Sequence, residues 1–369
     1  MIVSILIFLV VLSVLILVHE FGHFIVAKRA GIWVEEFGLG LPPRAIGKKI
    51  GETIYSLNWL PFGGFVRLHG ENVEEGITDK KRAFLYKSKK TRALVVTAGV
   101  IMNFLLAILA FTIVYSFSGF PAPVKTVKVL DIVQGSPALT AGIVVGDVIK
   151  KVNGHEIKDT TDFQNLIQES KGKKVILEIQ SGGGDTTTVK HVTLAALQDK
   201  NDGRYYLGIV IPSDIFFPPV WQRPFYGAYY GFKDALSWGN IIARGLWNVI
   251  TGIAAGQAPK ELSGPVGIFA VTTEAAKNGI LTLINFVGIL SVNLAILNII
   301  PFPALDGGRL LFIGIESIIG KKVVPKVEAT IHTVGMIILL LILLAITIGD
   351  VKHLITAGGI SNFLSTMGK

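Results

Sequence analysis

The chain has 369 residues, of which 51% are hydrophobic and only 17% are charged, and it contains no cysteine. Charged residues make up about a quarter of an ordinary soluble protein, so long uncharged stretches are expected, while disulfides, thiolate zinc ligands and catalytic thiols are excluded. The formal net charge of +9 could indicate nucleic acid, but in an apolar chain basic residues more often set membrane topology or contact anionic lipid.

Four stretches are long and apolar enough to cross a bilayer, which takes roughly 20 residues. Apart from a polar cluster near the end of the first, none of them contains Asp, Glu, Lys or Arg. The first has no basic segment before it and no small-residue cleavage site after it, which favours an uncleaved helix over a signal peptide. A fifth uncharged segment, 245–259, is short and is predicted to lie at the interface or to be packed. The predicted spans are residues 1–27, 93–120, 280–305 and 329–349.

The loops between these spans differ in charge. Residues 28–92 contain 13 Lys and Arg against 7 Asp and Glu, whereas residues 121–280 contain 16 against 14 over more than twice the length. Basic loops stay in the cytoplasm, so the first loop and the loop 306–328 are predicted to be cytoplasmic. Both termini, including the tail 350–369, are then extracytoplasmic. Topology accounts for the basic excess, and no nucleic-acid partner is predicted.

The first span contains the run His19-Glu20-Phe21-Gly22-His23. On a helix the two histidines lie one turn apart on one face, so both can bind one Zn²⁺ while Glu20 acts as general base toward water. In a soluble helix two ordinary histidines would explain the run equally well. Inside a membrane each ionisable group costs a few kcal/mol, which favours a metal site. Counted from Lys28 at ~1.5 Å per residue, the site lies about 13 Å inside the cytoplasmic edge.

Two histidines at a catalytic zinc are usually joined by a carboxylate. Asp306 is the candidate, because the third span runs from outside to inside and brings it to the same side of the membrane as His19 and His23. Two prolines break the helix just before it, and broken backbone at membrane depth lines cavities. A helix-end cap is the alternative role for Asp306. The run reads Asn298-Ile299-Ile300-Pro301-Phe302-Pro303-Ala304-Leu305-Asp306-Gly307-Gly308.

These two motifs together resemble the site-2 protease family of intramembrane zinc proteases, and within it the bacterial regulator-of-sigma-E protease group. The run Gly264-Pro265-Val266-Gly267 supports the resemblance, which covers nearly the whole chain. It implies one Zn²⁺ per chain bound by His19, His23 and Asp306, with Glu20 activating water and Asn298 contacting the substrate backbone or the developing oxyanion.

The resemblance also implies a function and a location. The expected protein is an endopeptidase of the bacterial cytoplasmic membrane that hydrolyses peptide bonds within transmembrane segments of single-pass proteins, such as anti-sigma factors or signal-peptide remnants. Its partners are these substrates and the lipid bilayer. A catalytically inactive membrane-bound PDZ adaptor is the alternative. A transporter is disfavoured, because transporters commonly contain internal repeats and none is visible here.

A substrate helix must unwind before it can be cut, and a strand that accepts the unwound segment by β-addition would hold it open. Residues 54–57 and 65–68 are strand-like and are separated by a Pro- and Gly-containing segment. The run 61–66 resembles the family's membrane-re-entrant β-hairpin, although an ordinary cytoplasmic hairpin would show the same pattern. The residues predicted to contact substrate are Gly63, Gly64, Phe65 and Val66.

Residues 121–212 have the character of a separate α+β domain. Strands are predicted at 127–133, 175–179 and 189–194, and a helix at 161–169. The landmarks Gly135-Ser136-Pro137-Ala138, Gly146-Asp147-Val148-Ile149 and Val152-Asn153-Gly154 resemble a PDZ domain. By this resemblance Leu207, Gly208 and Ile209 form the strand and loop that capture a peptide C-terminus. The domain would bind peptides or exclude large substrates; an unused groove is the alternative.

Residues 213–279 form a linker rich in aromatic and small residues, predicted to lie at the outer membrane interface or to be an ordinary packed linker. The predicted fold is therefore an α-helical multi-pass membrane protein with about four transmembrane helices. A membrane-associated β-hairpin region lies in its first cytoplasmic loop. An extracytoplasmic PDZ domain is inserted between its second and third spans.

Overall fold

The computed structural model describes residues 2–71, 77–181, 188–198, 203–256, 264–320 and 324–357. The chain divides into two compact units. The first unit combines Met1–Val114 with Ala228–Lys369 and is mostly helical, and the second, Tyr115–Gly227, is mostly strand. The second unit is thus inserted into the first, as the sequence predicts.

Within the described residues four helices are long and apolar enough to cross a membrane. They coincide with the four predicted spans, although their ends differ. The third helix stops at Ile299, because Pro301 and Pro303 cannot continue it. The fourth continues eight residues beyond the predicted end at 349, and residues 358–369 of the predicted tail lie outside the described residues. The helices are α1 (Ile2–Arg29), α2 (Lys89–Ser118), α7 (Ile280–Ile299) and α9 (Pro325–Ala357).

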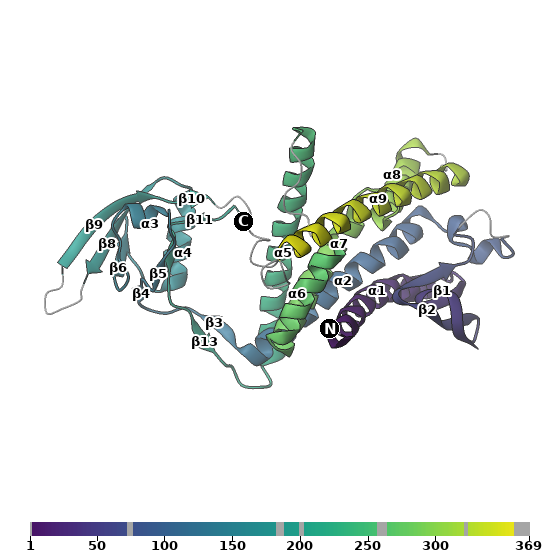
Figure 1. The fold of residues 1–369 in the computed structure, drawn as a ribbon, viewed down its shortest axis with the longest axis horizontal. Coiled ribbons are helices and arrows are strands. Elements are labelled where there is room, and N and C mark those ends of the chain that lie inside the picture. Colours follow the sequence, from purple (N-terminus) through teal and green to yellow (C-terminus); the bar gives the residue numbers. More distant parts are fainter. Residues whose placement is uncertain are drawn as a thin grey trace. The chain divides into compact units, whose positions relative to one another are not determined.

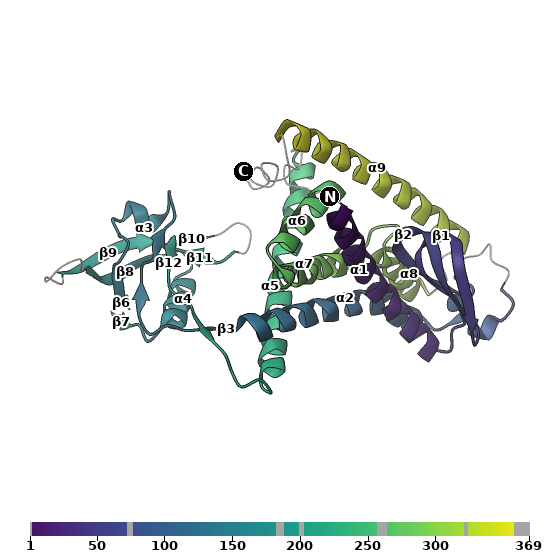
Figure 2. The same ribbon diagram turned by 60° about the horizontal axis from the view of Figure 1, so that its bottom comes forward.

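Three further helices belong to segments that the sequence left as linker or loop (Figures 1 and 2). The linker 213–279 forms α5 (Arg223–Ala254) and α6 (Pro265–Lys277). The short uncharged segment 245–259 is, as far as it is described, the end of α5. Residues 306–319 form α8 (Asp306–Ile319), so the segment 306–328 is not a plain loop. Glycines 307 and 308 at its start have low helix propensity, so the sequence did not predict a helix here.

The N-terminus of α6 is capped by an aspartate of α9. Asp350 is only 7% exposed and accepts hydrogen bonds from the backbone N–H groups of Gly264 and Gly267 at 2.9 and 3.0 Å. A Cβ at Gly264 would lie 2.8 Å from the Ile346 side chain. The Gly264–Gly267 run therefore has a structural role, which is to let α9 approach and cap α6.

A long hairpin, β1 (Val34–Ile50) with β2 (Thr53–Leu68), packs against α1 (Figure 1). The two segments predicted to be strand-like, 54–57 and 65–68, both belong to β2 and pair with β1 rather than with each other. Residues 36–39 have partners at 64–67 and also at 54–57, while 44–50 pair with 53–58. The charges, glycines and prolines of β1 interrupt the alternation that would have predicted a strand.

Two short helical turns, η1 (Lys80–Arg82) and η2 (Phe84–Tyr86), lead from the hairpin to α2. Arg92 at the start of α2 forms an ion pair with Glu316 of α8, and both side chains are 3% exposed. Lys89 donates to the Glu316 backbone carbonyl at 2.6 Å. These contacts fix α8, and with it the residue that begins α8, against α2.

The second unit is built on the sheet β4-β6-β8-β9, with β7 paired to β6. The predicted strands and helix are confirmed by β4, β5, β8, β9 and α4, although residues 182–187 of the β8–β9 turn lie outside the described residues. Val127, Ile149, Leu177 and Phe163 belong to its buried core. The bounds are β3 (Phe120–Ala122), β4 (Val127–Lys128), β5 (Asp131–Ile132), α3 (Pro137–Thr140), β6 (Val148–Val152), β7 (His155–Glu156), α4 (Thr160–Glu169), β8 (Lys174–Ser181), β9 (Thr188–Ala195), β10 (Leu197–Gln198), β11 (Tyr205–Tyr206), β12 (Ile209–Val210) and β13 (Asp214–Phe216).

Breaking the buried ion pair should destabilise the first unit. Arg92→Met removes a buried cation from the Glu316 carboxylate, which should lower the free energy of unfolding by about 3–5 kcal/mol. Chemical unfolding in detergent measures the change. Lys277→Met is the matched control, because its pair with Glu274 is 63% and 42% exposed and should contribute less than about 1 kcal/mol. Equal losses in the two variants would contradict the prediction.

Candidate metal centre

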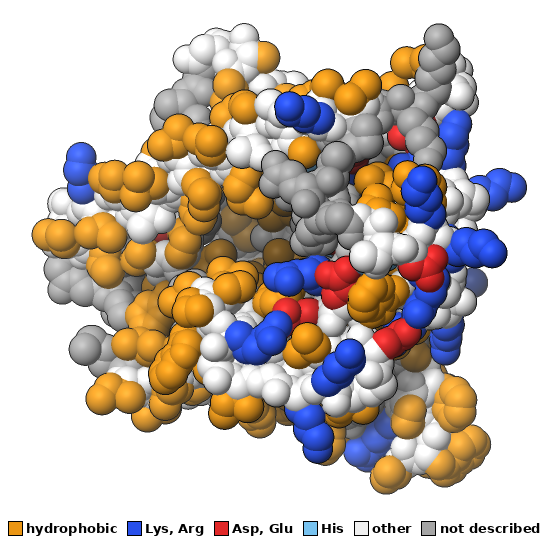
Figure 3. Space-filling view, turned by 90° about the vertical axis from the view of Figure 1, so that its right-hand side faces the viewer, with side chains coloured by type: hydrophobic (Ala, Val, Ile, Leu, Met, Phe, Trp, Pro, Cys, Tyr) orange, Lys and Arg blue, Asp and Glu red, His pale blue; other side chains and the backbone are white. Residues whose placement is uncertain are grey.

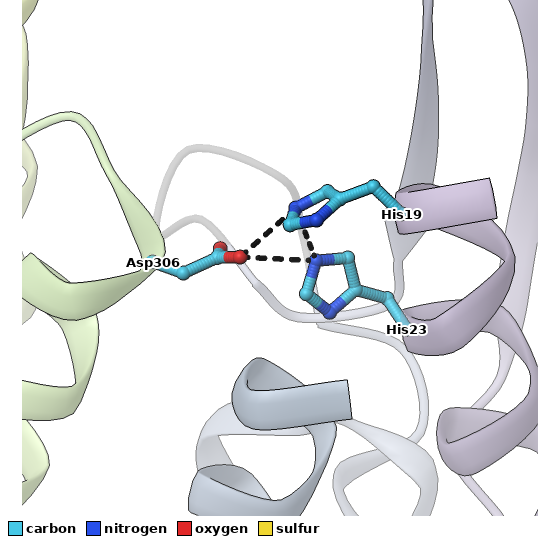
Figure 4. A group of neighbouring side chains, drawn as sticks. All are labelled: His19, His23 and Asp306. Atoms are coloured by element: carbon cyan, nitrogen blue, oxygen red, sulfur yellow. Dashed lines mark hydrogen bonds and ion pairs between the residues drawn. The ribbon is translucent and has the colours of Figure 1, made fainter. Parts of the chain in front are cut away.

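Helix α1 presents His19 and His23 on one face, one turn apart, as the spacing predicts. Their Nε2 atoms are 3.2 Å from each other, and the rings meet edge to face. The two side chains are 11% and 13% exposed. Figure 4 shows both imidazoles turned toward Asp306 at the start of α8. The two predicted half-sites are therefore brought together.

Asp306 completes the group. Its Oδ2 lies 3.0 Å from Nε2 of His19 and 3.3 Å from Nε2 of His23. The turn before α8 is tight, because a Cβ at Gly307 would lie 2.0 Å from the Ile300 carbonyl oxygen and one at Gly308 would lie 2.5 Å from that of Phe302. The two glycines allow the chain to fold back and aim Asp306 at α1.

The three atoms fit a zinc ion. In a tetrahedral site with bonds of ~2.0–2.1 Å, ligand atoms stand about 3.3 Å apart, close to the separations of 3.0–3.3 Å found here. His23 Nδ1 lies 2.8 Å from the Val95 carbonyl oxygen, which can only accept. That nitrogen therefore carries the proton, and Nε2 keeps its lone pair for a metal. The donor set of two imidazoles and a carboxylate is that of catalytic zinc.

The loop that carries Asp306 is held by α9. Ala304 adopts a left-handed conformation, with φ of 82°, and its backbone N–H donates to His332 Nδ1 at 3.0 Å. A Cβ at Gly335 would lie 2.3 Å from Pro303, so α9 packs directly on the loop. Through His332 and Gly335, which lie one turn apart, α9 thus fixes the loop that precedes Asp306.

Glu20 lies between the metal ligands and the hairpin. Its Oε2 accepts a hydrogen bond from the backbone N–H of Val66 at 3.1 Å. In the part of the chain that the structure describes, residues 64–67 pair with β1 on one side only, so Val66 stands on a free edge of the sheet. The candidate general base therefore contacts the strand that was predicted to receive substrate.

A cavity of about 630 Å³ joins these groups. It brings together Glu20, His23, Asp306, Phe65 and Val66 of the predicted residues. Its described lining does not include His19, Gly63, Gly64 or Asn298. His19 contacts the lining residue Asp306 from α1, the two glycines lie in the hairpin, and Asn298 lies in the last turn of α7. The lining also comprises Leu68, Glu71, Phe84, Val95, Val96, Ala304, Leu305, Arg309, His332, Thr333, Met336 and Ile337.

Three titratable residues of the cavity were not predicted as site residues. Arg309 forms an ion pair with Glu71, which links α8 to the end of β2, and His332 reaches the cavity from α9. His332 is the one titratable group in the fourth predicted span. A lone titratable residue in an apolar span could have been predicted as a site residue from the sequence. Arg309 and Glu71 lie in charged loops, where nothing in the sequence distinguishes them.

The sequence model of peptidase family M50 matches residues 7–342. The chain belongs to peptidase family M50. It is 39% identical over 343 residues to a putative zinc metalloprotease of Clostridium perfringens, an alignment that covers 93% of this chain and 97% of the relative. It is 29% identical over 426 residues to zinc metalloprotease RasP of Geobacillus kaustophilus, covering 95% and 98%, and 28% identical over 428 residues to RasP of Oceanobacillus iheyensis, covering 94% and 98%.

The M50 protein is therefore a membrane-embedded zinc metalloprotease with zinc as its cofactor. This confirms the predicted family, enzyme class and metal. The alternatives of an inactive adaptor and of a transporter lose their support.

A side chain at Gly99 of α2 should disturb the centre. A Cβ there would lie 2.5 Å from His23 Nε2 and 2.6 Å from His19 Cε1, so Gly99→Ala must displace both imidazoles. We expect zinc affinity to fall at least about tenfold, within the range for disturbed ligand support, as measured by competition with a chelator. Gly252→Ala in α5 is the control, since nothing lies within 4 Å of its Cβ. Unchanged affinity in Gly99→Ala would place the metal elsewhere.

Proposed function

We propose that this M50 protein cuts transmembrane segments of single-pass membrane proteins inside the bilayer, with anti-sigma factors and signal-peptide remnants as the expected substrates. The observation that carries the proposal is the cavity lined by His23, Asp306, Glu20 and the free edge of β2, with His19 next to it in the same ligand group. In it His19, His23 and Asp306 hold zinc. Asn298, at the end of α7, is assigned to the substrate backbone or the developing oxyanion.

Glu20 is the general base in this proposal. When bound, zinc makes water a better nucleophile at neutral pH and polarises the scissile carbonyl. Glu20 follows His19 in α1, so its carboxylate lies beside the ligand group without belonging to it. It takes the proton of the attacking water and delivers it to the leaving amine.

The edge of β2 receives the substrate. A helical carbonyl is already hydrogen-bonded within its own segment, and in lipid that bonding must be replaced when the helix opens. Strand addition replaces it with main-chain hydrogen bonds. Phe65 and Val66 line the cavity, and the Val66 N–H faces Glu20. Gly63 and Gly64, just before them, allow a close approach of the substrate backbone, and the positive φ of Gly63 suits glycine.

The second unit is proposed to be a PDZ domain. A cavity of about 560 Å³ lies between α4 and residues 204–211 and is lined by Leu207, Gly208 and Ile209 together with Phe163 and Ile167. This is the expected place for a peptide C-terminus. Binding of such a peptide, or exclusion of substrates with a bulky extracytoplasmic part, is the proposed role of the domain.

The proposed location is the bacterial cytoplasmic membrane, with the hairpin in the cytoplasm and both termini outside. Figure 3 shows Lys and Arg side chains spread over the end of the first unit that carries the hairpin, as expected for a cytoplasmic surface. In the linker, Trp221, Phe225 and Tyr229 are 71%, 74% and 60% exposed. Exposed aromatic rings of this kind support a place at the outer interface.

The chemistry is tested by Glu20→Gln. Removing the base while leaving the three ligands should reduce cleavage of a model transmembrane substrate by at least about 10²-fold, the lower range for general-base catalysis, with zinc content unchanged. Gel-based cleavage and metal analysis of the purified protein measure the two quantities. Glu274→Gln, on the exposed end of α6, is the control. Full activity of Glu20→Gln would remove the proposed mechanism.

Strand addition is tested by Val66→Pro. Proline removes the N–H on the free edge without removing a bond to β1, so KM for the substrate should rise several-fold while zinc is retained. Val66→Thr keeps the N–H and serves as the control. Equal KM values for the two variants would show that substrate does not pair with this edge.

A further inference from the structure

Helix α2 contributes no metal ligand, yet it contacts both histidines. The Val95 carbonyl accepts from His23 Nδ1, and Gly99, one turn later, gives the imidazoles their space. Asn103 follows after one more turn, with its Nδ2 placed 3.4 Å from His19 Nδ1. The outer nitrogen of each histidine therefore faces α2. One of the two partners is backbone and the other is a side chain.

Asn103 is fully buried, with 0% exposure, and its Oδ1 has no hydrogen-bond partner among the described residues. A buried amide oxygen without a partner costs free energy. The residue is held in place by Ser291 of α7, whose Oγ donates to the Asn103 backbone carbonyl at 2.8 Å. The packing of α2 against α7 therefore places the Asn103 side chain beside His19.

The orientation of the amide follows from the metal. A histidine that binds zinc through Nε2 carries its proton on Nδ1, and a protonated Nδ1 cannot face an NH₂ group. The oxygen and nitrogen of an amide are exchanged by a half-turn and are assigned from their partners. Exchanging them pairs the amide oxygen with the His19 Nδ1–H and turns the NH₂ group to the side on which the oxygen has no partner among the described residues.

We propose that Asn103 is a positioning residue, whose side-chain carbonyl accepts the His19 Nδ1–H and fixes the tautomer and ring orientation that bind zinc. The inference rests on the proposed ligation of zinc by His19. Outer partners of this kind orient metal-bound histidines, and their loss typically costs 10–100-fold in affinity. His23 has its partner in the α2 backbone, so substitution can remove this support only at His19.

The test compares Asn103→Leu and Asn103→Asp with the wild type in the full-length protein in detergent. The dissociation constant for Zn²⁺ is measured by competition with a chelator, and the unfolding temperature of each metal-free protein is recorded. Asn103→Leu keeps the branched shape and the number of side-chain heavy atoms but has no acceptor, so its zinc affinity should fall about 10–100-fold. Asn103→Asp keeps an acceptor and should remain within about threefold of the wild type. Thr97→Val in the same helix is the control, because the Thr97 hydroxyl donates to carbonyls of α2 itself, those of Ala93 and Leu94.

The outcomes separate this inference from the metal site itself. His19→Ala should lose tight zinc binding; if wild type binds no more tightly than His19→Ala, the proposed ligand set fails. If wild type binds tightly and Asn103→Leu equals it, only the role of Asn103 is overturned. If Asn103→Asp is as weak as Asn103→Leu while all metal-free proteins unfold at the same temperature, the amide does not act as an acceptor, and the inference is overturned as well.

Discussion

The centre depends on a contact between two segments that lie almost 300 residues apart. His19 and His23 arrive on α1 and Asp306 arrives at the start of α8, and their ligand atoms lie 3.0–3.3 Å from one another. A carboxylate and two imidazoles would be costly in an apolar surrounding without a partner. A cation at this point satisfies all three, which explains why the surrounding helices converge on it.

Glycine makes this convergence possible at three of the close contacts around the site. Gly22 lets α1 meet the α2 backbone, Gly99 makes room for both imidazoles, and Gly335 lets α9 press on the loop before Asp306. In membranes, small residues at interfaces allow helices to approach without a hydrophobic driving force between them. Some of the 41 glycines of the chain are therefore explained by the close contacts that helices make around the metal site.

The sequence alone predicts the helices and the ligands because both leave local patterns. A run of 20 uncharged residues or a pair of histidines at i and i+4 can be read directly, and Asp306 follows from topology. The pairing of β1 with β2 could not be predicted from the sequence. Residues 36–39 have a strand partner on each side, at 54–57 and at 64–67, and no local pattern specifies these partners. Arg309 and Glu71 were missed for a related reason: their role is created by the approach of α8 to the end of β2.

Glu20 connects the two halves of the proposed reaction. Its carboxylate accepts the Val66 N–H, which is also the group that an added substrate strand would engage. Substrate and base therefore compete for one donor. In the proposed reaction, pairing of a substrate carbonyl with Val66 would release the Glu20 carboxylate toward water, whereas in the structure the carboxylate is bonded to the strand edge. An edge placed next to the base thus favours hydrolysis of a segment that is already unwound and paired over hydrolysis of one that is still helical.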